Sequence, residues 1–300
     1  MVYPSTIKFL IKNGDFNKIL RSIKFYLIDN FKKKNLVQKN NQLIINGCKM
    51  QILEKDDGIS SELLSYGIHE PLSTQLMNKE VKSGMTIIDI GSNIGYYAIL
   101  ENKLVGKYGK VFSIEPSPKN FELLNRNLEL QPQKNFQTYN LAINDKNEKI
   151  EFIINKKSNW SKIREPTDII GKDDEVIKIA SKTLDEFCNE EEIERIDLIR
   201  MDVEGLEVKI IEGSKNILKK YQPRIMMEVH KSHIGKRKTK QMLEELQKLN
   251  YNIQYYYPRI FDSPIIAEKK DIKKISMEQL INQLKEDRLP EVFQVILINK

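Results

Sequence analysis

Two short acidic motifs carry side chains that can move protons. Asp202 and Glu204 close one apolar segment of the chain, and Glu228 and His230 close another. Both segments have the composition of buried parallel strands, whose carboxyl ends border the ligand crevice in doubly wound folds. A carboxylate or imidazole placed there can take the proton of an attacking hydroxyl, which typically contributes about 10²–10⁴-fold in rate. We therefore predict that these four residues form the catalytic set, with Asp202 or His230 as the base.

A glycine turn precedes these acids in the chain. Asp89 stands just before Gly91 and Gly95 at a strand-to-helix boundary, and Glu115 ends the next strand, 24 residues after Gly91. Glycine allows a tight turn and a close approach of the backbone to a ligand. An acid at the tip of the second strand can accept hydrogen bonds from the two hydroxyls of a ribose. The pattern therefore predicts a site for an adenosine-type nucleoside.

The charge of Asp89 distinguishes between nucleoside ligands. The dinucleotide pattern G-x-G-x-x-G is absent, because Asn93 and Tyr96 occupy two of its positions, and no P-loop Gly-Lys-Ser/Thr follows a strand. A carboxylate two residues before the first glycine would repel a pyrophosphate, whereas it suits a cation. S-adenosylmethionine carries both an ammonium and a sulfonium. The alternative interpretation is a glycine-rich turn that binds nothing.

Alternating strand and helix patterns surround these motifs. Such alternation, with two antiparallel strands at the end, predicts an α/β fold with a doubly wound, mostly parallel, seven-stranded Rossmann-like sheet. The expected sheet strands are 86–90, 110–115, 136–143, 196–202, 224–230, 251–257 and 292–298. Residues 149–154 and 175–180 are expected to form an inserted antiparallel pair. Thr183 to Glu186 and Ser117-Pro118 are expected to open helices.

Six motifs, in this order, resemble the FkbM-type methyltransferases. They are Asp-Ile-Gly-Ser-Asn-Ile-Gly-Tyr-Tyr (89–97), Ile-Glu-Pro-Ser-Pro (114–118), Asn-Leu-Ala-Ile (140–143), Thr-Leu-Asp-Glu-Phe (183–187), Met-Asp-Val-Glu-Gly (201–205) and Glu-Val-His (228–230). The resemblance covers residues 43–230. It implies the class I methyltransferase fold and S-adenosylmethionine as cofactor. The family mostly O-methylates hydroxyls of sugars, polyketides and related small molecules.

The resemblance also implies roles for individual residues. Glu115 would hold the ribose, Ala142 would lie near the adenine, and Glu70 matches an acid that the family often carries before its first core strand. Arg200 stands where lysine is the commoner family residue. The residues implied to bind the cofactor are Glu70, Asp89, Gly91, Asn93, Gly95, Glu115 and Ala142. A divalent cation would suit the acidic set chemically, but we predict no metal site.

Positive charge is concentrated at the N-terminus. Residues 1–50 hold ten Lys/Arg and two acids, or +8, so the remaining 250 residues sum to −1 of the total +7. A nearly neutral body is not typical of a nucleic-acid-binding surface.

Two cysteines without a CxxC pair exclude a disulfide framework and favour a reducing cytoplasm. We expect no membrane span, because no run approaches about 18 apolar residues, and no secretory leader.

We expect residues 1–66 to form a basic helical and β-hairpin extension. A methyltransferase domain is expected over 67–300, with its core at 85–230. Asn46-Gly47 between two apolar runs is a hairpin signal. Residues 1–40 have a helical apolar pattern formed by Phe9, Leu10, Ile19, Leu20, Ile23, Leu27 and Phe31. This apolar set either packs on the catalytic domain or makes peripheral contact with an anionic membrane.

The leading hypothesis is therefore an S-adenosylmethionine-dependent O-methyltransferase acting on a sugar, glycan, glycolipid or other small hydroxylated acceptor. One alternative is an RNA methyltransferase that uses the basic N-terminus. The sequence lacks the Asn/Asp-Pro-Pro-Tyr/Phe and Pro-Cys motifs of base methylation. A nicotinamide-dependent oxidoreductase conflicts with the glycine turn. A non-catalytic S-adenosylmethionine-binding scaffold is less consistent with the intact acids. The acceptor and the oligomeric state have no signal in the sequence.

Overall fold

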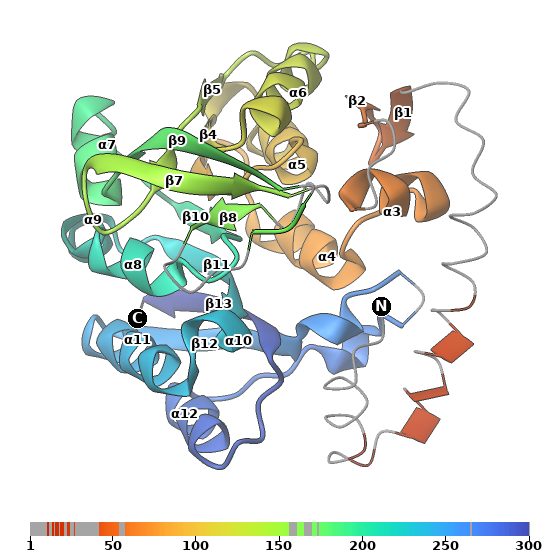
Figure 1. Cartoon of the computed structure of the whole chain (residues 1–300), viewed down its shortest axis with the longest axis vertical. Helices are drawn as coiled ribbons and strands as arrows, with labels where there is room; N and C mark the ends of the chain where they lie inside the picture. Colours follow the sequence, from red (N-terminus) through yellow and green to blue (C-terminus); the bar gives the residue numbers. More distant parts are fainter. Residues whose placement is uncertain are drawn as a thin grey trace.

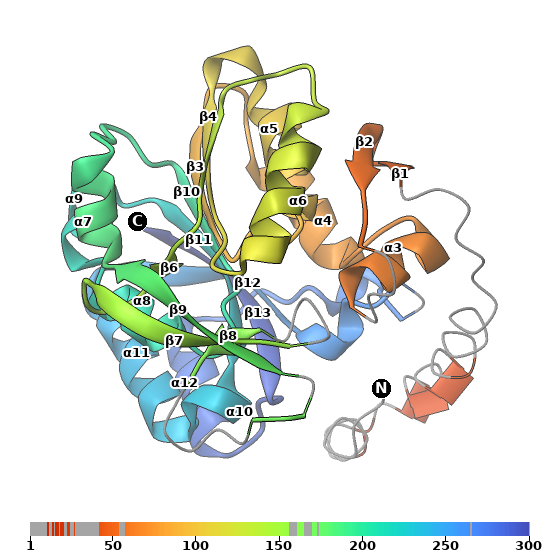
Figure 2. The same ribbon diagram turned by 45° about the horizontal axis from the view of Figure 1, so that its top comes forward.

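A computed structural model shows a three-layer α/β arrangement, with helices on both faces of a central sheet (Figures 1 and 2). It describes residues 42–53, 58–155, 161–164, 170–172, 174–264 and 266–299. Of the first 41 residues it describes positions 11, 14, 16, 17, 19, 20, 23, 24 and 27. Most of the predicted N-terminal helical segment therefore lies outside the described residues. No helix in the described parts is long and apolar enough to cross a bilayer.

The central sheet has seven strands, as the sequence predicts. Five are parallel, while β13 runs antiparallel to both of its neighbours, β11 and β12. The order across the sheet is β12 (Tyr251–Pro258), β13 (Val292–Asn299), β11 (Arg224–His230), β10 (Leu198–Met201), β3 (Thr86–Ile90), β4 (Lys110–Ile114) and β5 (Phe136–Tyr139). The order reverses between β3 and β10. That switch point is where doubly wound sheets bind ligands.

Helices cover the two faces of this sheet because alternate residues of each strand point to opposite sides. Ile88 and Ile90 of β3 pack into one buried cluster, and Ile87 packs into the other. One face is covered by α3 (Ile59–Tyr66), α4 (Pro71–Glu80), α5 (Tyr96–Val105) and α6 (Pro118–Glu129). The other is covered by α7 (Leu184–Glu190), α8 (Glu207–Glu212), α9 (Lys215–Tyr221), α10 (Lys231–Ile234), α11 (Lys236–Lys248) and α12 (Met277–Lys285).

The inserted segment forms a second sheet beside the carboxyl ends of the first. Its order is β6 (Ala142–Ile143), β9 (Glu175–Lys182), β7 (Glu148–Ile154) and β8 (Lys162–Ile163). The predicted antiparallel pair is confirmed as β7 and β9. The single strand predicted over 136–143 is wrong, because it divides into β5 and β6. The Asn140 side chain donates to the carbonyls of Glu115 and Pro116, which turns the chain out of the main sheet.

The predicted hairpin is confirmed as β1 (Gln42–Ile45) and β2 (Cys48–Gln51). Its turn residues Asn46 and Gly47 have φ angles of 51° and 74°, as a type I′ turn requires. The hairpin is joined to α6, where the Asn127 side chain bonds both backbone groups of Gln51. Its apolar residues share a buried cluster with β3. The boundary at residue 66 stays a prediction, and the hairpin packs as part of the catalytic core.

Candidate active site

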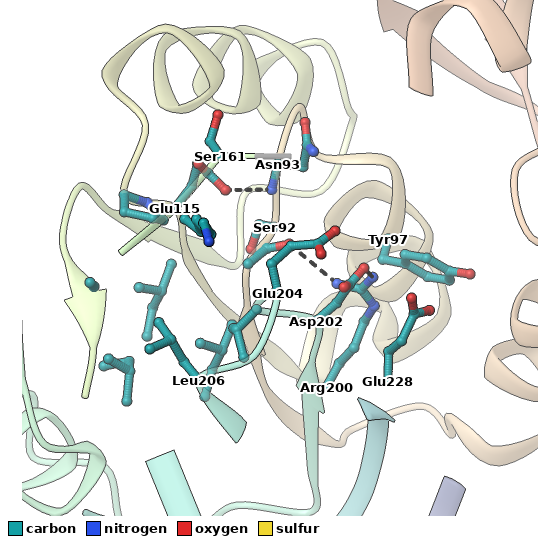
Figure 3. Close-up of a pocket in the computed structure, with 18 of the residues that line it drawn as sticks. Ser92, Asn93, Tyr97, Glu115, Ser161, Arg200, Asp202, Glu204, Leu206 and Glu228 are labelled. Carbon is teal, nitrogen blue, oxygen red and sulfur yellow. Dashed lines mark hydrogen bonds and ion pairs between the residues drawn. The ribbon is translucent and has the colours of Figure 1, made fainter. Parts of the chain in front are cut away.

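A cavity of about 960 Å³ opens at the carboxyl ends of β3, β4, β10 and β11 (Figure 3). Glu115 and Asn93 lie at one end, and Asp202, Glu204 and Glu228 converge at the other. Most of the predicted site residues thus come together. The predicted residues that line the cavity are Glu70, Gly91, Asn93, Glu115, Ala142, Asp202, Glu204 and Glu228.

The glycine turn is required for backbone packing. Gly91 has a φ of 82°, and a Cβ placed on it would lie 2.0 Å from the carbonyl oxygen of Asp202. Gly95 has a φ of 92°, and a Cβ there would lie 2.9 Å from Leu124 Cδ1. Gly91 also lines the cavity, whereas Gly95 is the N-cap residue of α5 and does not line it. The expected close approach at Gly91 is therefore to the chain after β10.

Glu115 is buried at the tip of β4 beside an apolar recess. Its Oε2 accepts from the Asn93 amide and its Oε1 from the Ser117 amide, both at 2.8 Å. Burial raises the pKa of Glu115 to about 7, although these amide hydrogen bonds oppose the shift. Ser117 is the N-cap residue of α6, but its hydroxyl makes no capping hydrogen bond, contrary to the sequence expectation. The recess is formed by Ile114, Leu141, Ala142, Ile143 and Phe152.

Asp89 is fully buried and does not line the cavity, unlike the sequence expectation. Its Oδ1 accepts from Arg200 Nη1 at 2.9 Å, and Arg200 Nη2 lies 3.1 Å from Asp202 Oδ2. The guanidinium also stacks on Tyr97, 4.0 Å from the ring centre. Burial alone would lower the pKa of Arg200, but Asp89 and Asp202 raise it. Asp89 therefore orients Arg200, which is the group that reaches the cavity.

The acidic end of the cavity follows β10 and β11. β10 ends at Met201, so Asp202 lies in the loop after it and not at the end of the predicted strand 196–202. Glu204 lies in the same loop. Burial raises the pKa of Glu204 to about 7, while the charge of His230 opposes that rise. Burial and the Glu228 charge raise the pKa of Asp202 to about 6, against the effect of Arg200. Of these two acids, Glu204 is the one whose protonation changes nearer neutrality.

His230 lies behind these acids and does not line the cavity. Its Nδ1 is 2.5 Å from Glu207 Oε1, and its Nε2 is 3.2 Å from Glu228 Oε1 and 3.3 Å from Glu204 Oε2. Burial alone would lower the pKa of His230, but the surrounding carboxylates raise it well above its usual value. Both ring nitrogens face carboxylates. The imidazole therefore acts as a buried cation that positions Glu204.

Glu70 joins the site from the loop before α4. Its Oε1 is 2.6 Å from Arg259 Nη2, and its Oε2 accepts from the Tyr97 hydroxyl at 2.8 Å. Burial would raise the pKa of Glu70, but Arg259 and His69 hold it well below its usual value. Arg259 Nε is also 3.1 Å from Glu228 Oε2. Arg259 comes from the 3-10 turn η3 (Arg259–Phe261), which no sequence motif marked.

Three lining residues adopt a backbone conformation that non-glycine residues rarely take. Glu70, Asn93 and Glu204 have φ angles of 44°, 50° and 49°. They are three of the eight described non-glycine residues with positive φ. Such positions cost of order 1–3 kcal/mol and concentrate at functional sites. The strained positions coincide with side chains that sequence analysis assigned to binding or catalysis.

Two residue sets have ligand atoms close enough together to hold a metal ion. They are Asp202 with Glu204 and His230, and Glu70 with Asp202 and Glu228, each with its atoms within 4.8 Å. Arginine or histidine side chains already pair with every carboxylate of these sets. The arrangement is a network of alternating charges that surrounds one side of the cavity.

A doubly wound sheet with this strand order, a glycine turn after β3 and an acid at the tip of β4 defines a class I methyltransferase. The methyltransferase FkbM domain model matches residues 89–253, and the chain belongs to this family. It is an S-adenosylmethionine-dependent methyltransferase of the FkbM type, which agrees with the family resemblance and the cofactor inferred from sequence. This assignment replaces the oxidoreductase and scaffold alternatives.

The individual relatives share low sequence identity with this chain. The 2-O-methyltransferase NoeI of Sinorhizobium fredii is 30% identical over 51% of this chain and 69% of its own length. The methyltransferase sdnD of Sordaria araneosa is 25% identical over 55% of this chain and 78% of its own length. The solved structure of Aeropyrum pernix fibrillarin with S-adenosylmethionine is similar at 11% identity and a TM-score of 0.42, over 76% of this chain and 74% of that one.

Proposed function

We propose that this enzyme O-methylates a hydroxyl of a sugar, glycan or other small-molecule acceptor, with Glu204 as the general base. The observation that carries the proposal is the placement of Glu204. It lines the cavity, has a pKa of about 7, and is fixed by the His230 cation behind it. A base with a pKa near the working pH is well suited to proton abstraction from an alcohol.

The residues of the cavity fit S-adenosylmethionine. The apolar recess around Ala142 suits an adenine ring, and Glu115 beside it suits the ribose hydroxyls. The methionine end would then lie toward Glu70 and Arg200. Anionic side chains at the far end suit a ligand with ammonium and sulfonium charges. When bound, this cofactor supplies an electrophilic methyl group.

The chain's own residues then have separate tasks. Glu204 accepts the proton of the acceptor hydroxyl, while His230 stabilises the carboxylate form of Glu204. Arg200 and Arg259 hold Asp202, Glu70 and Glu228 in place through the ion pairs described above. Alignment of the reacting groups supplies much of the rate in a displacement of this kind. The acidic network thus orients one base rather than offering several.

A groove provides a path for the acceptor. It lies among β8, α8 and α11. The groove shares Lys162, Ile163, Glu204 and Leu206 with the cavity. An acceptor that lies in the groove would reach the proposed base at the junction. The mixture of lysine, glutamate and glutamine side chains along it suits a hydroxyl-rich molecule such as a glycan.

Calorimetry with S-adenosylmethionine, with NADH as a comparison, tests the cofactor half of the proposal. We expect the protein to bind S-adenosylmethionine with micromolar affinity and not to bind NADH. The Glu115→Ala variant should bind S-adenosylmethionine more weakly. Transfer of a labelled methyl group to a panel of monosaccharides, oligosaccharides and glycolipids then tests the acceptor, with mass spectrometry to locate an O-methyl product. Transfer to RNA but to no hydroxylated small molecule would overturn the acceptor class.

Glu204→Gln tests the base on the best acceptor from that panel. The amide keeps the shape of the side chain but cannot take a proton. We expect the transfer rate to fall about 10²–10⁴-fold, with S-adenosylmethionine affinity within threefold of wild type. Asp202→Asn is the comparison variant. A larger rate loss in Asp202→Asn than in Glu204→Gln would move the base to Asp202.

A further inference from the structure

Large apolar side chains near the N-terminus are exposed. Phe16, Leu20, Ile23 and Leu27 have exposed fractions of 66%, 67%, 46% and 63%. With Ile11 they make up five of the nine large exposed hydrophobic residues in the described parts of the chain. Single exposed apolar residues are common on proteins, but a group of them indicates an interaction surface.

The spacing of these four residues is that of one face of a helix. All are in helical conformation, and they follow one another at intervals of four, three and four residues. At about 100° per residue this spacing keeps them within an arc of about 60°. We call the set Phe16, Leu20, Ile23 and Leu27 the apolar stripe. Its members therefore present one continuous surface.

The apolar stripe does not pack on the catalytic domain. Ile19 is the neighbour that packs, partly buried, against the cluster formed by α3–α6 and the hairpin. Figures 1 and 2 both show the described residues of this segment, in red, at the edge of the molecule. At 100° per residue, Ile19 lies about 40° outside this arc, beside Ile23, so the packed contact is at one edge of the stripe and its four members stay exposed. Of the two interpretations left open by the sequence, the outward-facing one agrees with the exposed fractions.

The charge of the segment indicates what covers the stripe. Residues 1–40 contain nine Lys/Arg and two acids, a net charge of +7, and Lys24 is exposed between Ile23 and Leu27. Pairing of this segment with the same segment of a second copy would bring like charges together. An anionic lipid surface suits both the apolar and the basic side chains, because the apolar side chains enter the acyl boundary and the lysines contact the headgroups.

We infer that the helical segment containing the apolar stripe seats the enzyme on an anionic membrane surface, in the plane of the interface. Each lysine or arginine near such a surface contributes roughly fivefold in affinity, and this contribution is screened by salt. Apolar contact is less sensitive to salt. Binding should therefore require both the lipid charge and the stripe.

Vesicle sedimentation of the full-length protein tests this inference. The probes are vesicles of phosphatidylcholine alone and of phosphatidylcholine with 30 mol% phosphatidylglycerol, at low and high salt. The test variant is the triple change Phe16→Ser, Leu20→Ser and Leu27→Ser. The matched control is Ile44→Ser on β1, because Ile44 has the same exposed fraction as Leu20, 67%. Affinity for S-adenosylmethionine checks that both variants fold.

We expect at least tenfold stronger partitioning to the anionic vesicles, a large loss at high salt, and a tenfold or greater loss in the triple variant. The control should partition like wild type. Equal partitioning of wild type and the triple variant would overturn the inference. So would a dimer, detected by ultracentrifugation, that the triple variant converts to a monomer, because a second copy would then cover the stripe. Failure of the proposed acceptor chemistry would leave these results unaffected.

Discussion

Different forces hold the residues in place at the two ends of the cavity. We call the end with Glu115, Asn93 and the turn at Gly91 the nucleoside end, after its proposed ligand. Backbone amides and a steric fit position its residues: Glu115 accepts from two amides, and Gly91 packs against the backbone of Asp202. At the acidic end, paired charges position them: Arg259 bridges Glu70 and Glu228. The geometry of the nucleoside end therefore depends on the absence of a side chain at Gly91, and the geometry of the acidic end depends on the charge of Arg259.

This difference explains how much of the site could be predicted from sequence. The nucleoside end comes from consecutive segments, so Gly91, Asn93 and Glu115 appear as one motif with fixed spacing. The acidic end gathers residues from the loop before α4, the ends of β10 and β11, and η3. Arg259 lies more than 50 residues after Asp202 in the chain. No local pattern connects such partners, since only the tertiary fold brings them together.

The fold shows the same division. Strand and helix periodicity predicted all seven strands of the central sheet, and the boundaries of β3 and β11 coincide with the prediction. The break between β5 and β6 was missed because it depends on the hydrogen bonds of the Asn140 side chain with the loop after β4. The role of Asp89 was missed for a related reason. Its partner Arg200 is on the neighbouring strand, 111 residues away.

Removal of the charge at Arg259 should have the largest effect on stability. Arg259→Ala leaves Glu70 and Glu228 buried without their shared cation, and such a loss typically costs about 3–5 kcal/mol. Arg126→Ala is the control, because its ion pair with Glu122 is exposed and should contribute below about 1 kcal/mol. Urea denaturation of both variants measures the difference. Equal midpoints would show that the acidic end does not depend on paired charge.

A side chain at Gly91 should destabilise the nucleoside end, because its Cβ would clash with the backbone of Asp202. Gly91→Ala and Gly84→Ala have nearly the same φ angle, 82° and 84°, but only the first meets a clash, since nothing lies within 4 Å at Gly84. The backbone penalty is therefore shared, and overpacking should cost Gly91→Ala about 1–3 kcal/mol more. Thermal unfolding and S-adenosylmethionine binding measure both effects. Two equally stable variants would refute the steric account of this turn.

The charge of Glu115 is expected to control cofactor affinity, so the nucleoside end is not wholly independent of charge. Its pKa is raised to about 7, and the carboxylate is the form that accepts ribose hydroxyls. S-adenosylmethionine should bind more tightly as the pH rises from 6 to 8. Glu115→Gln should weaken binding about ten- to hundredfold at pH 8 and flatten this dependence. An unchanged pH dependence in the variant would assign it to another group.

The smallest change expected in catalytic behaviour is a shift in the pH profile of His230→Gln. Loss of the imidazolium raises the pKa of Glu204 further, because a positive charge no longer favours the carboxylate. The rising limb of activity against pH should move about one unit toward alkaline pH. His233→Gln is the control, because burial and the His230 charge lower the pKa of His233, whereas the pKa of His230 is raised. A lower rate with an unmoved profile would show that His230 has only a structural role.

The close contact between Gly91 and Asp202 makes the methyl-donor half and the loop that bears Glu204 one inseparable unit. The inserted sheet is different, because β7 and β8 add Phe152 and Lys162 to the wall of the cavity from outside the central sheet. Libraries that search for new acceptors should therefore vary the insert and leave residues 89–95 and 201–205 constant. If the proposed function holds, the insert is the part of the cavity wall that can be changed without disturbing the contact between Gly91 and Asp202.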